Sequence, residues 1–364
     1  MSNIIAISIA ALFLLFYMIT SSIEFGSTLF LVSPRLLGEN EIRSYINPIW
    51  ETTNVFLVFV VVCLFAFFPG SISFFGRDLL WPVALFLIIS GIRVAGVLLY
   101  YYGGFRPGLI RGLLFITSFL VPMVLAQFVV YVLTGTVVLH GGSYAVSSAV
   151  SLVSSTSFAV GSLGATAALG SALALFAGTT TLAISTAFFQ FFVAARPKVG
   201  QKASSAIGLT ADQMADQNVK QEPELQIDAL RFVADISGLV FTFAIAVLLF
   251  AAERFAPHLF ADPAKVTLAG TVLVICLLLA IFFWRLRRPL LYFFGSCLAT
   301  AGITFALFYL NLPYLVYPNV TIYSSWTDPA VVPALFTSFV VGIIVIIPSF
   351  FLLFRLFVVG RKSE

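Results

Sequence analysis

Long apolar stretches alternate with short polar ones along the whole chain. Nine of the apolar stretches are long enough to cross the ~30 Å hydrocarbon core of a bilayer as helices. They lie at residues 4–32, 51–69, 79–102, 109–136, 160–195, 229–251, 265–284, 289–312 and 331–356. The pattern therefore predicts an all-α, polytopic membrane helix bundle with about nine transmembrane helices. The first and fifth stretches exceed what a bilayer needs, so we expect those helices to tilt, break or protrude.

The composition supports a membrane protein. Of 364 residues, 61% are hydrophobic and 9% are charged, whereas a soluble domain carries about 25% charged residues. The three cysteines all lie inside apolar stretches, which favours small buried residues over a disulfide framework or a thiolate metal site. The start of the chain has no basic region and no small-residue cleavage site, so we interpret it as a retained first span.

The basic residues alternate from one loop to the next. The first, third, fifth and seventh loops hold most of them, for example Arg35, Arg106, Lys198 and Arg285, and the C-terminus adds Lys362. By the positive-inside rule, this predicts an N-terminus outside and a C-terminus in the cytoplasm. The net charge of +4 thus reflects topology and gives no reason to expect nucleic-acid binding.

The order of the spans suggests how the chain is organised. We expect a single integral membrane domain over residues 1–364, because no second domain is needed. Five spans, a long polar segment and four more spans suggest two related four-helix halves plus one extra helix, with the first half at 1–136 and the second at 137–364. The polar segment, 197–228, is predicted to be a cytoplasmic linker with a short surface helix that starts near a capping-box sequence at 210–213.

A few ionisable side chains interrupt the apolar stretches. Glu24 lies deep in the first span, and a charge at such depth costs at least ~2.5–3.5 kcal/mol, so it normally faces a protein interior. Arg93 falls at a similar depth, and Glu51 opens the second span on the same, cytoplasmic side. One interpretation is a buried ion pair that fixes helix register, with Glu51 as a helix-start acid. The other is a proton route from the cytoplasm to mid-membrane, with Ser21 and Asn54 as hydrogen-bonding steps.

Several kinds of chemistry lack the residues they need. The two histidines, His140 and His258, fall in loops predicted to be outside, so paired haem ligands within the bundle are not expected. Phosphate-binding glycine loops, a nucleophile elbow and the His and Glu spacing of zinc or di-iron helices are also missing from the sequence. We therefore assign this chain no catalytic residue, bound cofactor or metal.

Four short segments carry a family resemblance. Residues 21–26 stand where the family has Asp-Gly-Phe-Asp-Met-Gly, and residues 48–57 are similar to its Trp-Asp/Glu-x-x-Asn-x-Val region. Residues 92–96 are similar to its Phe-Arg-Pro-Val-Gly, and residues 321–328 to its last segment. In order and spacing these segments resemble subunit II of the cytochrome bd quinol oxidases. The matching motif residues include Trp50, Gly26 and Gly96.

The resemblance implies a heterodimer with subunit I, which carries two b-type haems, a d-type haem and the quinol site. It implies a multi-pass protein of a prokaryotic plasma membrane, within an electrogenic, oxygen-reducing complex of a respiratory chain. Subunit II of this family binds no haem and contributes to cytoplasmic proton supply. Glu51 would then be the proton entrance and Glu24 the deeper relay beside Arg93. The resemblance leaves room for a structural quinone or lipid and for a small accessory subunit.

The family's acids are not all present here. Ser21 replaces the first Asp of the span-one pattern, and the acid that follows Arg-Pro-Val-Gly is replaced within residues 97–99. The proton route is therefore expected to be a shorter one, from Glu51 to Glu24.

Two alternatives remain at this stage. An ion-coupled secondary transporter would also use membrane carboxylates and two related halves, and it predicts broken helices around a midplane site. The glycines of the fifth span fit that pattern: Gly161, Gly164, Gly170 and Gly178. The first half of the chain has no matching cluster of glycines. The other alternative is a scaffolding subunit with no role in proton transfer.

Overall fold

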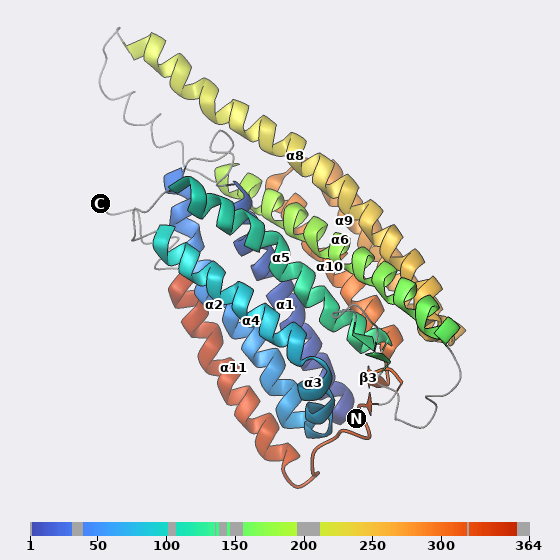
Figure 1. Ribbon diagram of the computed structural model, residues 1–364. Helices are drawn as coiled ribbons and strands as arrows, with labels where there is room; N and C mark the ends of the chain where they lie inside the picture. The colour runs from blue at the N-terminus through green and yellow to red at the C-terminus, as the bar shows by residue number, and fades with distance from the viewer. Residues whose placement is uncertain are drawn as a thin grey trace.

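A computed structural model describes residues 2–30, 39–100, 107–134, 136–137, 144–145, 156–194, 212–318 and 320–354. Nine long helices make up most of these residues, one at each predicted span (Figure 1). They are α1 (Ser2–Phe30), α2 (Glu39–Phe67), α4 (Leu80–Leu98), α5 (Pro107–Thr134), α6 (Thr156–Ala194), α8 (Asp212–Phe255), α9 (Pro263–Arg285), α10 (Pro289–Asn311) and α11 (Val332–Phe354). The all-α membrane bundle predicted from the sequence is confirmed.

Short elements join the long helices at the bundle ends. Among the described residues these are η1 (Pro69–Ser71), α3 (Ile72–Asp78), η3 (Pro257–Phe260) and two small antiparallel hairpins, β1 (Thr136–Val137) with β2 (Tyr144–Ala145), and β3 (Tyr314–Val316) with β4 (Val320–Thr321).

Seven of the described helices are long and apolar enough to cross a membrane by themselves. The second predicted span is bent: Thr53–Phe67 and Pro69–Gly76 meet at 101°. Pro69 explains this break, because proline disfavours helical backbone in the residue before it and has no N–H to donate. The ninth predicted span contains a shorter apolar helix, Val332–Val345, within α11.

Two helix starts differ from the expectation. Helix α2 begins at Glu39, so Glu51 lies twelve residues inside it, beyond the first turn where the helix dipole favours acids. The interpretation of Glu51 as a helix-start acid is therefore wrong. Helix α8 begins at Asp212, within the predicted capping box, and continues unbroken to Phe255. The expected short surface helix is thus the first part of a membrane helix, while residues 197–211 lie outside the described residues.

Helices α6 and α8 are the longest in the bundle. Helix α8 has 44 residues, about 66 Å at 1.5 Å per residue, and it extends past the ends of its neighbours (Figure 1). Helix α6 has 39 residues and continues without a break past all four of its glycines. The long fifth span therefore protrudes rather than breaks, and the broken helix that a transporter would need is absent from α6.

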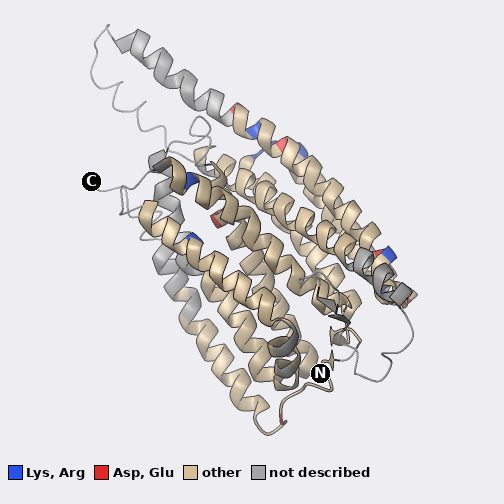
Figure 2. Cartoon of the chain, viewed as in Figure 1, with Lys and Arg blue, Asp and Glu red and all other residues tan. Residues whose placement is uncertain are grey.

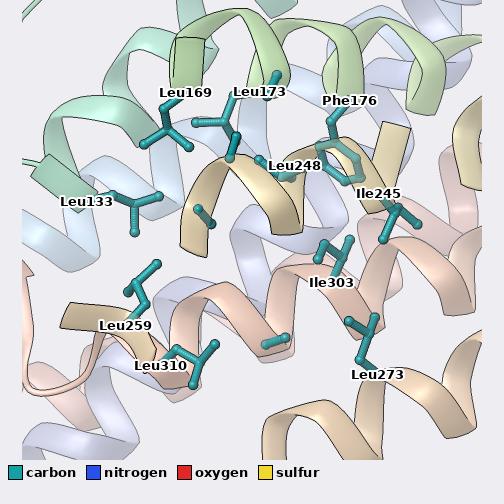
Figure 3. Close-up of a cluster of buried hydrophobic side chains, with 14 of the residues drawn as sticks. Leu133, Leu169, Leu173, Phe176, Ile245, Leu248, Leu259, Leu273, Ile303 and Leu310 are labelled. Carbon is teal, nitrogen blue, oxygen red and sulfur yellow. The ribbon is translucent and has the colours of Figure 1, made fainter. Parts of the chain in front are cut away.

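The two largest of five buried apolar clusters join most of the helices. The larger lies between α5, α6, α8, α9 and α10, and Figure 3 shows side chains such as Leu169, Phe176, Leu248 and Ile303 meeting there. The second joins the N-terminal part of α1 to α2, α11 and the β3–β4 hairpin. Between membrane helices such side chains stabilise the bundle through van der Waals packing, because lipid is as apolar as the core.

The outer surface of the bundle is also apolar. On α8, Phe232, Leu239, Phe243 and Phe250 are 62–73% exposed, and their spacing of four or seven residues places them on one helix face. An apolar outer face suits lipid or a membrane partner rather than water. Charged side chains are sparse across the middle of the bundle and gather along α8 and at the bundle ends (Figure 2).

Candidate functional site

Glu24 of α1 and Arg93 of α4 form an ion pair inside the bundle. Arg93 Nε lies 3.3 Å from Glu24 Oε1, and the two side chains are 4% and 5% exposed. Every residue of α1 from Ser21 to Phe30 is buried, so this part of the helix is enclosed on all sides. The similar depth expected for Glu24 and Arg93 is confirmed, and the ion pair of the first interpretation is present.

The rest of the Arg93 guanidinium is also satisfied. Nη1 donates to Ser118 Oγ at 2.8 Å and to the Leu114 carbonyl at 3.4 Å. Nη2 donates to Thr28 Oγ1 at 3.2 Å and to the Glu24 carbonyl at 3.4 Å. A buried charge is tolerated only when its partners replace water in this way, so helices α1 and α5 together make the site for this arginine.

Two hydroxyl groups close the site on the side of α5. Thr28 Oγ1 and Ser118 Oγ are 2.5 Å apart. Each is also close to a carbonyl of its own helix: Thr28 Oγ1 is 2.7 Å from the Phe25 oxygen and Ser118 Oγ is 2.6 Å from the Leu114 oxygen. The ring of Phe25 lies 4.7 Å from Arg93 Cζ and adds a cation–π contact.

Helix α2 reaches the same carboxylate. The Thr53 hydroxyl is a hydrogen-bond partner of the Glu24 side chain, and Thr53 is 1% exposed. Thr53 stands between Glu51 and Asn54, so α2 brings the predicted acid-bearing segment to the ion pair. Tyr17 is 5% exposed and lies two turns before Glu24 on the same face of α1.

The other predicted polar residues differ in how far the structure describes them. Ser21 Oγ donates to the Met18 carbonyl of its own helix at 3.2 Å. Asn54 lies on the exposed side of α2, which in a membrane faces lipid or a partner. The side chains of Glu51 and Trp50 lie outside the described residues.

The two predicted motif glycines allow helices to approach closely around the ion pair. A Cβ on Gly26 would lie 2.0 Å from Ser185 Cβ on α6, so only glycine permits α1 and α6 to meet there. A Cβ on Gly96 would lie 3.2 Å from Leu114 Cδ2 on α5. Gly26 therefore has a packing function two residues from Glu24, and Gly96 has one three residues from Arg93.

Sequence reasoning missed Thr53, Thr28 and Ser118. Two signals were available. Thr53 lies within the acid-bearing segment, and Thr28 is four residues from Glu24, so Thr28 and Glu24 share one helix face. Ser118 carries no such signal, since it is one of several polar residues in an apolar span.

Of the two histidines, His258 in η3 stacks on Tyr317, with ring centroids 3.7 Å apart and an interplanar angle of 12°. Burial lowers the pKa of His258, while a hydrogen bond with Asn311 opposes that shift. His140 lies outside the described residues. In the part of the chain that the structure describes, three or more His, Cys, Asp or Glu side chains do not gather in any arrangement that could hold a metal ion.

Fold and site together define a helical membrane protein with a charge pair buried between four helices. A family model, "Cytochrome bd terminal oxidase subunit II", matches residues 2–357, and the chain belongs to this family. It is 26% identical over 372 residues to the "Putative cytochrome bd menaquinol oxidase subunit II" of Bacillus subtilis (strain 168), with 99% of this chain and 96% of that protein covered. The sequence resemblance is thereby confirmed.

A solved structure shows the same fold. The bd oxidase from Geobacillus thermodenitrificans contains a chain that superposes with a TM-score of 0.70 at 22% identity, with 99% of both chains covered. The chain is thus a membrane-embedded subunit of a quinol oxidase complex, in a family whose haems lie on the partner subunit. A whole-length match to this family leaves the transporter alternative without support.

Proposed function

We propose that this chain packs against a haem-bearing subunit I and helps to bring cytoplasmic protons to the site of oxygen reduction in an electrogenic quinol oxidase. Quinol would be oxidised on subunit I, and this chain would supply no catalytic residue. The observation that supports the proposal most strongly is Glu24. It is a carboxylate held in the membrane interior among hydroxyl groups from α1, α2 and α5.

The geometry of the ion pair suits a relay better than a purely structural contact. Arg93 engages the Glu24 carboxylate through Nε alone, and its other nitrogens donate elsewhere. A bidentate pair would occupy both carboxylate oxygens. With one contact from Arg93, the second oxygen can accept a proton while the arginine keeps its remaining partners.

Thr53 supplies the connection toward the cytoplasmic side. It hydrogen-bonds Glu24, and Glu51 precedes it by two residues, about 3 Å along the helix axis but on another helix face, so a water would have to bridge Glu51 and Thr53. We therefore place Glu51 as the proton entrance, Thr53 as the intermediate hydroxyl and Glu24 as the deeper relay. The positive-inside pattern supports the assignment of this end to the cytoplasm.

The first test uses Glu24→Gln and Glu51→Gln in the purified two-subunit complex. Each variant should lower quinol oxidase turnover by about tenfold or more, which corresponds to a barrier raised by about 1.4 kcal/mol or more. Haem content, read from the absorption spectrum, should stay near that of the native complex. Glu24→Asp, which keeps a carboxylate, should recover part of the turnover.

Glu253→Gln is the matched control. Glu253 is an exposed carboxylate near the C-terminal end of α8, away from the ion pair, so this variant should keep full turnover. If both test variants keep full turnover, the relay is wrong and the ion pair only fixes helix register. If haem content falls in parallel with turnover, the loss reflects assembly rather than proton transfer.

A further inference from the structure

A small cavity lies where α9 ends and α10 begins, against α6 and α8, and apart from the Glu24 cluster. Its volume is about 60 Å³, which holds several waters at ~10–15 Å³ each, or one phosphate group. A second cavity of about 260 Å³ adjoins it and adds Ile281 and Arg285 to the lining. The first is lined by Gln190, Arg231, Asp235, Trp284, Arg287 and Tyr292.

Two polar groups of this cavity are buried without a partner. Gln190 is 4% exposed, and its Oε1 makes no hydrogen bond. The indole Nε1 of Trp284 is likewise unpaired. Buried polar groups are nearly always hydrogen-bonded, so each unpaired one needs an explanation. Trp284 Nε1 can only donate and Gln190 Oε1 can only accept, so Trp284 can donate to an anion while Gln190 can accept from a hydroxyl group of the same ligand.

The tryptophan is held in place by its neighbours. Its ring stacks on Tyr292 at a centroid distance of 5.6 Å, and the Tyr292 hydroxyl donates to the Ala234 carbonyl. A Cβ on Gly295 would lie 3.0 Å from Trp284 Nε1, which shows how closely the indole packs on α10. The donor is therefore fixed in position before any ligand arrives.

The charge of the joined cavities is positive. Arg231, Arg285 and Arg287 contribute three positive charges and Asp235 one negative charge, which leaves a net charge of +2. Arg231 also pairs with Asp228 at 3.2 Å, but the side chains are 47% and 71% exposed. Such an exposed pair contributes little, so Arg231 can turn toward a ligand at low cost.

We propose that these cavities bind the phosphate group of an anionic phospholipid. Basic pockets between membrane helices on the cytoplasmic side are suited to such headgroups. A lipid fits better than a soluble anion because the surrounding surface is apolar: Ile236, Leu239 and Phe282 are 48%, 73% and 56% exposed. The acyl chains would lie on that surface while the phosphate accepts a hydrogen bond from Trp284 and faces the arginines, and a headgroup hydroxyl donates to Gln190 Oε1.

The experiment is a lipid titration of the purified, delipidated complex by native mass spectrometry. Phosphatidylglycerol should bind one site that Arg231→Gln and Arg287→Gln each weaken by about fivefold, the effect of one basic residue near a membrane surface. Trp284→Phe keeps the ring and removes the N–H, and it should weaken binding by about tenfold, as expected for a hydrogen bond to a charged group. Arg254→Gln, an exposed arginine near the other end of α8, should leave binding unchanged.

Two further probes identify the source of the phosphate. Phosphatidylcholine, whose headgroup has no net charge, should bind this site weakly, and millimolar inorganic phosphate should not displace phosphatidylglycerol. Displacement by inorganic phosphate would overturn the lipid assignment in favour of a soluble anion. Equal phosphatidylglycerol binding by the native complex and all three site variants would overturn the site itself. Because the readout is binding, neither result depends on whether Glu24 carries protons.

Discussion

At the scale of single residues, the described part of the chain shows two ion pairs of nearly the same length in opposite surroundings. The Glu24–Arg93 pair is 3.3 Å long and buried, and the Asp228–Arg231 pair is 3.2 Å long and exposed. Loss of one partner from a buried pair leaves an uncompensated charge, whereas exposed pairs contribute about 0–1 kcal/mol. Burial rather than distance should therefore decide what each pair contributes to stability.

Arg93→Met should lower the free energy of unfolding of the complex by about 3–5 kcal/mol, because it leaves the Glu24 carboxylate buried and unpaired. Arg231→Met, which breaks the exposed pair, should cost less than about 1 kcal/mol. Equilibrium unfolding in a denaturing detergent, followed by haem absorbance, measures both. The double variant Glu24→Gln with Arg93→Met removes both charges and should recover most of the loss. Equal costs for the two single variants would contradict this account.

Part of the site could be predicted from residue types alone. Glu24 and Arg93 stand out because charges are rare in apolar stretches, and the positive-inside pattern placed them at the same depth. The hydroxyls of Thr53, Thr28 and Ser118 could not be ranked in the same way. Threonine and serine often donate to their own helix, as Ser21 does here, so which of them face a neighbour depends on helix rotation, which composition does not reveal.

At the scale of the helix, α1 and α6 meet at one point that admits no side chain. Gly26→Ala would place a Cβ 2.0 Å from Ser185 Cβ and force the helices apart, at a cost of about 1–3 kcal/mol or more. Gly178→Ala on α6 is the control, because a Cβ there meets nothing within 4 Å and should be neutral or stabilising by up to about 1 kcal/mol.

Thermal unfolding midpoints of the purified complex would report these changes. Adding Ser185→Gly to Gly26→Ala removes the clashing Cβ and should restore part of the lost stability. A Gly26→Ala complex as stable as the Gly178→Ala complex would show that α1 and α6 are not in contact at this point.

The apolar pattern predicted all nine long helices but not their full lengths. Hydropathy reports where lipid ends, and a helix can continue into water without a change in backbone geometry. This is why the polar start of α8 was taken for a separate helix and why α2 was expected to begin twelve residues late. The bend after Phe67 had a visible signal in Pro69 and Gly70, a pair that marks a turn.

At the scale of the whole molecule, the basic loops predict an N-terminus outside and a C-terminus in the cytoplasm. Ser363→Cys should therefore react with a membrane-impermeant maleimide in inverted vesicles but not in intact cells. Ser324→Cys, at an exposed position of the turn after β4, should show the reverse. Any labelling of the native cysteines is background, and it is measured on the chain without an introduced cysteine. Labelling of Ser363→Cys from outside would contradict the orientation and move Glu51 to the wrong side for a cytoplasmic proton entrance.

The hydroxyl pair beside Arg93 has a consequence for how hydrogen bonds are shared in the cluster. Thr28 and Ser118 own one hydroxyl hydrogen each, yet three short oxygen contacts, to each other and to two carbonyls, compete for those two hydrogens. At any moment one of the three contacts therefore lacks a hydrogen. Which contact lacks it can change by rotation of the hydroxyl groups, while every oxygen and carbon stays in place. The membrane interior thus contains hydrogen bonds that can be rearranged by rotation of two hydroxyl groups, with no helix motion at all.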